Sequence, residues 1–229
     1  MSAAQAALAV TWIGVTLYAL FGGADFGAGF WDLVAGGADR GRSPRRLIER
    51  VIAPVWEANH VWLIFVLVML WTCFPPVFAA VASSLYQPLT LAAVGIILRG
   101  AGFAIRKTMH DLVEQRFFGA VFATSSVMTP YALGAVAGAV ASGRVPLGNA
   151  QADPWTSWVN PTSVLGGVLA VGVCAYVAAV FLCHNAVVAG DDDLVDYFRR
   201  RATVTAVAVG VRASRDRGAP PRLLICSTA

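Results

Sequence analysis

The sequence predicts an all-α fold: a polytopic transmembrane helix bundle with about five complete transmembrane helices, an incomplete sixth and the N-terminus outside. Three observations support this prediction. Of the 229 residues, 58% are hydrophobic and only 13% are charged, with a mean hydropathy of +0.67, whereas soluble domains carry about 25% charged residues. The charged residues gather in short segments. The apolar blocks between these segments are long enough to cross a bilayer as helices, and they lack the alternating pattern of an outer-membrane barrel.

Five apolar segments are predicted to be complete membrane-crossing helices, at about 6–34, 52–82, 86–106, 117–141 and 162–186. Pro75 and Pro76 are expected to break the second of them near its outer end. A sixth apolar run, 202–211, is too short to cross a bilayer. The basic segment after it has no helical periodicity, which predicts a disordered tail or a truncated version of a longer protein. The expected organisation is therefore a transmembrane domain at 1–211 and a tail at 212–229.

Lysine and arginine set the expected orientation. Segments 39–50, 106–116 and 191–201 carry 5, 3 and 3 of these residues, while the opposite side carries only Arg144. Since basic loops stay in the cytoplasm, the three segments are predicted to be cytoplasmic, with a multi-pass arrangement in the cell (plasma) membrane. The net charge of +4 belongs to these loops and does not indicate binding to nucleic acid.

Small residues recur at helix-packing intervals in two of the predicted helices. Ala19, Gly23 and Gly27 form one stripe, and Gly134 and Gly138 form another. Such stripes allow membrane helices to approach closely, so we interpret them as packing surfaces.

Four charged residues lie inside the apolar segments: Asp25, Asp32, Glu57 and Arg99. Such groups are functional candidates because a charge in hydrocarbon is costly unless it is paired or hydrated. With a helical rise of about 1.5 Å per residue, Asp25, Glu57 and Arg99 all fall roughly 10–15 Å from the cytoplasmic surface. Two interpretations stay open, a buried ion pair between Arg99 and one carboxylate, or a hydrated proton relay tuned by Arg99. Asp32 lies nearer the helix end, where snorkelling or capping is expected.

The inventory of metal and haem ligands is poor. His60 is the only histidine deep in an apolar segment, and together with Asn59 it is expected to hydrogen-bond beside Glu57. A site with two axial histidines would need a partner at matching depth. Cys73, Cys174 and Cys183 have no short-range metal spacing and are interpreted as packing residues. No metal site and no cofactor bound by this chain alone are predicted.

Four strings resemble subunit II of cytochrome bd-type quinol oxidases: GGADFGAGFWDL, IAPVWEANHVWLI, CFPPVFAA and LRGAGFAIRK. The resemblance covers about residues 8–210 and stops where the basic tail begins, although the family chain continues through further helices. It implies a heterodimer with a haem-binding subunit I in a bacterial membrane, in a complex that oxidises quinol and reduces dioxygen to water. The haems would lie in the partner, and a quinone site on this subunit is left open.

The resemblance also implies roles for individual residues. Acidic residues of subunit II are associated with proton delivery. The acidic position after Trp56 falls on Glu57, and the second acidic position of the first helix falls on Asp25. The first acidic position of that helix falls on Gly22, so this carboxylate is missing.

The alternative function is a secondary transporter with a substrate site formed by Asp25, Glu57 and Arg99. Transporters of this kind carry broken helices near the middle of the membrane, whereas Pro75 and Pro76 lie away from the charges. A purely structural membrane subunit is the third class considered.

Overall fold

The computed structural model describes residues 2–37, 41–108, 112–146 and 153–216, and these form seven helices and no strand. The helices are α1 (Ala3–Leu33), α2 (Arg42–Cys73), α3 (Pro75–Ser84), α4 (Tyr86–Thr108), α5 (Leu112–Ala141), α6 (Pro161–Ala189) and α7 (Asp192–Asp216). Five of them, α1, α2, α4, α5 and α6, are long and apolar enough to span a membrane. The predicted helical transmembrane bundle is therefore confirmed.

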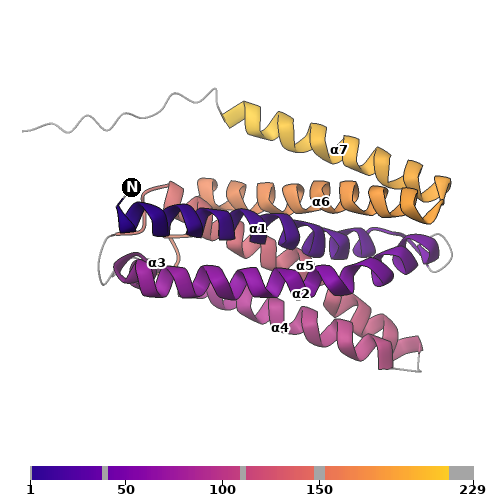
Figure 1. Cartoon of the computed structure of the whole chain (residues 1–229), viewed down its shortest axis with the longest axis horizontal. Coiled ribbons are helices and arrows are strands. Elements are labelled where there is room, and N and C mark those ends of the chain that lie inside the picture. Colours follow the sequence, from indigo (N-terminus) through magenta and orange to yellow (C-terminus); the bar gives the residue numbers. More distant parts are fainter. Residues whose placement is uncertain (1, 38–40, 109–111, 147–152, 217–229) are drawn as a thin grey trace, which may run out of the picture.

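Helix α1 is central to the bundle. It packs on α2, α5 and α6, while α4 packs on α5 and α7 packs on α6 (Figure 1). A buried core joins α1, α2, α6 and α7 through Trp31, Ile48, Leu182 and Phe198, among others. The indole N–H of Trp31 donates to the backbone carbonyl of Ala175 at 2.8 Å, which fixes α1 against α6.

Local sequence signals explain several of the helix ends. Ser2 caps α1 in a reciprocal arrangement with Gln5, and the side chain of Asn160 caps α6. Gly190 ends α6 in the left-handed conformation (φ 69°), which a residue with a side chain adopts only with strain. Asp191 then accepts a hydrogen bond from the backbone N–H of Leu194 at 3.1 Å and caps the start of α7.

The expected helix boundaries were wrong where charged segments flank the apolar runs. Helix α2 begins at Arg42 instead of near 52, α5 begins at Leu112 instead of near 117, and α7 begins at Asp192 inside the predicted loop 191–201. The polar ends extend the helices beyond their apolar parts because backbone hydrogen bonding does not require an apolar side chain. The break before Pro75 is present and separates α2 from α3 at Phe74.

The C-terminal region also differs from expectation. Helix α7 runs through the apolar run 202–211 and ends at Asp216, so the first residues of the predicted tail are helical. Val209 reaches Gly172, which places this part of α7 along α6. Helix α7 is not among the five helices apolar enough to span a membrane. The rest of the predicted tail, 217–229, lies outside the described residues.

The predicted glycine stripes lie where α6 approaches α1 and α5. A β-carbon on Gly27 would overlap the backbone carbonyl of Cys174, and one on Gly134 would lie 2.5 Å from the carbonyl oxygen of Gly166. Gly138 faces the backbone of α6 in the same way, and Gly23 faces Val177 at 3.3 Å. Glycine is needed at 27, 134 and 138 because backbone, rather than a movable side chain, fills the adjacent space.

Candidate functional site

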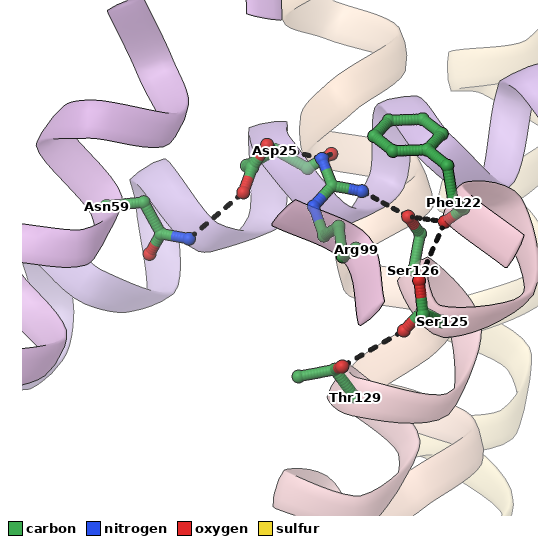
Figure 2. A network of polar contacts seen from close by, with 7 residues as sticks. All are labelled: Asp25, Asn59, Arg99, Phe122, Ser125, Ser126 and Thr129. Carbon is green, nitrogen blue, oxygen red and sulfur yellow. Dashed lines mark hydrogen bonds and ion pairs between the residues drawn. The ribbon is translucent and has the colours of Figure 1, made fainter. Parts of the chain in front are cut away.

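The candidate site is built on an ion pair between Asp25 of α1 and Arg99 of α4 (Figure 2). Both side chains are enclosed by the bundle, with exposed fractions of 0% and 2%. The Nη2 atom of Arg99 donates to the Asp25 carboxylate and also, at 2.8 Å, to the backbone carbonyl of Asp25. The sequence left open which carboxylate neutralises Arg99, and the structure assigns this role to Asp25.

Arg99 has further partners on two helices. Its Nη1 atom donates to the hydroxyl of Ser126 on α5, which in turn donates to the backbone carbonyl of Phe122 at 2.6 Å. The guanidinium lies over the rings of Phe122 and Phe26, 4.4 and 5.2 Å from their centroids. Arg99 therefore joins α1, α4 and α5 through charge, hydrogen bonds and cation–π contacts.

Asn59 connects a fourth helix to the same centre. Its Nδ2 atom donates to the second carboxylate oxygen of Asp25 at 3.2 Å, across from Arg99 (Figure 2). Asn59 lies on the buried face of α2, together with Ile52 and Val55. The Asp25 carboxylate is thus held from both sides, by a cation and by an amide, which is the arrangement that makes a buried charge tolerable.

A small pocket, with a cavity volume of about 10 Å³, lies over this centre. Asp25, Asn59 and Arg99 contribute to it, together with Tyr18 of α1 and His60 of α2. The residues that line the pocket come from α1, α2 and α4, so it lies between these three helices. Tyr18 and Ser126 were missed by the sequence analysis because an uncharged polar residue in an apolar helix is a weak signal.

Glu57 does not join the site, and the expected convergence of Asp25, Glu57 and Arg99 was wrong in this respect. Its side chain is exposed on α2, on a helical stripe with Val61, Ile64, Val68 and Trp71. Within the described part of the chain it forms no ion pair or hydrogen bond, and it does not line the pocket. The helical rotation of about 100° per residue turns Glu57 away from the face that carries Trp56 and Asn59.

The polar neighbours of Glu57 also differ from expectation. Asn59 bonds to Asp25 instead of lying beside Glu57, and His60 is exposed, with its ring 5.7 Å from that of Trp56. No group of three His, Cys, Asp or Glu side chains suited to a metal ion occurs among the described residues. The site therefore offers charge pairing and polar contacts, which can position helices and pass protons.

Asp32 lies outside this centre, near the end of α1. It is 5% exposed and forms an ion pair with Arg45 of α2 at 2.8 Å, so of the two expected roles, snorkelling or capping, snorkelling to solvent was wrong. Arg45 also donates to the backbone carbonyl of Gly36 at 2.8 Å. The pair therefore ties the end of α1 to the start of α2.

Sequence comparison identifies the family. Residues 3–214 match the family described as cytochrome bd terminal oxidase subunit II. The chain belongs to this family. The resemblance found in the sequence is thereby confirmed. The transporter alternative is not favoured, and Asp25 and Arg99 pair with each other.

Individual relatives of this subunit II chain are bacterial. The chain is 28% identical to the cytochrome bd-I ubiquinol oxidase subunit 2 of Escherichia coli (strain K12), over 74% of its own length and 46% of the relative's. It is 26% identical to the cytochrome bd ubiquinol oxidase subunit 2 of Bacillus subtilis (strain 168), over 70% and 47% of the two chains. The chain thus spans about half the length of these relatives.

The fold of this subunit II chain is similar to a solved structure of the bd oxidase from Geobacillus thermodenitrificans. The TM-score is 0.71 with 26% sequence identity, and the match covers 91% of this chain and 66% of that one. With five helices able to span a membrane, these relatives indicate a bacterial membrane protein.

Proposed function

We propose that this chain acts as a membrane subunit of a cytochrome bd-type quinol oxidase in the bacterial plasma membrane. There it assembles with a haem-binding subunit I into a complex that oxidises quinol and reduces dioxygen to water. The observation that supports this proposal is the family match, which extends over residues 3–214 and includes all the helices that carry the buried charges.

In this proposal the haems belong to the partner subunit. His60 is exposed beside Trp56, and His184 lies near the end of α6. His60 lines the pocket over Asp25 from α2, whereas His184 is in the last turns of α6 and does not line that pocket, so the two histidines do not suggest a shared haem. The chain's contribution is to support the partner and to supply a path for protons.

The buried centre and Glu57 have different roles in this path. Asp25 and Arg99 hold α1, α4 and α5 in register, because each satisfies the charge of the other. Glu57 is the proton-carrying group, located on an exposed apolar stripe where a carboxylate facing lipid would be costly. The partner subunit is expected to cover this stripe, with a polar or hydrated group opposite Glu57, so Glu57 would lie at the subunit interface.

The test is turnover per assembled haem in the complete oxidase complex containing this chain. Glu57→Gln removes the exchangeable proton but keeps the shape of the side chain, and it should slow oxygen reduction by about tenfold or more, since a positioned acid or base contributes typically 10²–10⁴-fold. Glu57→Asp should retain much of the activity because the acid survives with a shorter reach.

Asp193→Asn serves as the matched control, since it removes an exposed carboxylate at the start of α7. It should leave turnover unchanged. Normal turnover per haem in Glu57→Gln would rule out the proton role. Absence of haem from the complex purified through this chain would rule out the oxidase function itself.

A further inference from the structure

Three buried polar atoms around the pocket over Asp25 have no hydrogen-bond partner among the described residues: Tyr18 Oη, Asn59 Oδ1 and Arg99 Nε. They come from α1, α2 and α4, three different helices. The side chains of Asn59 and Arg99 are more than nine-tenths buried. An unsatisfied polar atom in the interior of a membrane bundle is costly. The Asp25 carboxylate, the side-chain nitrogen of Asn59 and the other nitrogen atoms of Arg99 have hydrogen-bond partners, so three unsatisfied atoms around one pocket require an explanation.

We propose that this pocket is an internal water site, in which one ordered water is bound by Tyr18, Asn59 and Arg99. Buried waters typically make about three hydrogen bonds to groups that are otherwise unsatisfied. The cavity volume of about 10 Å³ is close to the roughly 10–15 Å³ that a single water needs. The chemistry of the three atoms is complementary to water. Arg99 Nε donates, Asn59 Oδ1 accepts, and the Tyr18 hydroxyl can do either.

The surroundings of the pocket allow water to enter. His60 forms part of its wall and is itself exposed, so its side chain can move without breaking a buried contact. Gly22 lies against Asn59 Oδ1, where its ideal β-carbon would be 3.0 Å away, and this absence of a side chain leaves the amide oxygen unhindered on that side. In this proposal Tyr18 positions the water beside the Asp25–Arg99 pair.

The first measurement is hydroxyl-radical labelling by X-ray pulses, with mass spectrometry, on the full chain in lipid nanodiscs with its co-purifying subunits. Radicals form from the water molecules next to a side chain, so a residue that binds an internal water is labelled quickly despite its burial. Tyr18 should be labelled several-fold faster than Tyr131, which is also half-buried but packs on Gly167 away from the pocket. Equal labelling of the two tyrosines in the folded protein would overturn the proposal.

The second measurement is the direction of the melting-temperature shift in Tyr18→Phe. In a hydrated pocket the substitution removes a ligand of the water, and the melting temperature should fall. In a dry pocket it removes an unsatisfied hydroxyl, and the melting temperature should rise. Tyr176→Phe, which removes a hydroxyl from an exposed tyrosine of α6, is the control and should shift it little. A rise for Tyr18→Phe relative to this control overturns the proposal, and neither measurement depends on oxidase activity.

Discussion

Asp25, in the buried centre with Arg99, and Glu57, on the exposed stripe of α2, are both carboxylates at a similar expected depth, but their surroundings are opposite. Asp25 is enclosed and held by Arg99 and Asn59. Glu57 is exposed on an apolar stripe of α2 and has no partner in the described part of the chain. The depth of a charge in a membrane helix therefore does not determine its role. The direction in which it points decides whether it stabilises the bundle or remains available to something outside it.

The largest effect is expected at the buried centre. Asp25→Leu leaves the Arg99 guanidinium buried without a counter-charge and should destabilise the protein by about 3–5 kcal/mol, with loss of folded material. Asp25→Leu combined with Arg99→Met removes both charges and should recover most of that stability. Thermal unfolding in detergent or nanodiscs measures both variants. If the double variant is no more stable than the single one, Asp25 does not stabilise the protein through its ion pair with Arg99.

A smaller effect is expected at Gly27, which lies on α1 near Asp25 but carries no charge. Gly27→Ala places a methyl group against the backbone carbonyl of Cys174, and the resulting overpacking should cost about 1–3 kcal/mol. Gly210→Ala in α7 is the control, because no atom lies within 4 Å of its ideal β-carbon. Equal unfolding temperatures for the two variants would show that α1 and α6 can separate slightly without loss.

At Glu57 the expected change in stability is smaller still. Glu57→Gln should alter the free energy of unfolding of the isolated chain by about 0.5 kcal/mol or less, as for other exposed substitutions away from a specific contact. The comparison with Asp25→Leu under identical conditions measures this directly. A loss of several kcal/mol would mean that Glu57 makes stabilising contacts within the bundle, and the two regions would then not differ in the way described.

The smallest expected effect is local and lies outside the membrane-spanning segments. The backbone N–H groups of Thr156 and Trp155 donate to the Asp153 carboxylate and lower its pKa from the ordinary value. Because the folded pKa lies below the unfolded one, this contribution is present above the unfolded pKa and is lost as the pH falls through the folded pKa. Amide hydrogen exchange at 155–156, corrected for intrinsic rates, should show reduced protection in acid. Asp153→Asn should abolish this pH dependence, whereas an unchanged profile would contradict it.

Hydropathy predicted the membrane-crossing parts of the chain better than it predicted the helices. All five apolar segments are helical and able to span a membrane. The helix starts at Arg42 and Asp192 were missed because both lie in charged segments that resemble loops in a hydropathy profile. A helix that leaves the bilayer can continue in polar surroundings, and only capping residues such as Asp191 show where it begins.

The site was predictable in depth but not in direction. Counting residues along three helices brought Asp25 and Arg99 to one level, and the structure pairs them. The orientation of Glu57 was not accessible in the same way, because α2 is apolar on both its buried and its exposed faces in the membrane. Polar periodicity, which identifies the buried side of a soluble helix, is therefore missing. The contribution of Ser126 was also hidden, since hydroxyl groups are common in membrane helices.

The long sequence separation between α1 and α6 has a consequence for how the protein is made. The carbonyl that receives the Trp31 indole lies 144 residues further along the chain. At about 5–20 residues per second, roughly 7–30 s of synthesis separate the two residues. Arg99 follows Asp25 by only 74 residues, so it becomes available about 4–15 s after Asp25. The ribosome therefore supplies Arg99 before the helix that completes the glycine contacts, and Asp25 spends only the first part of assembly without its cation.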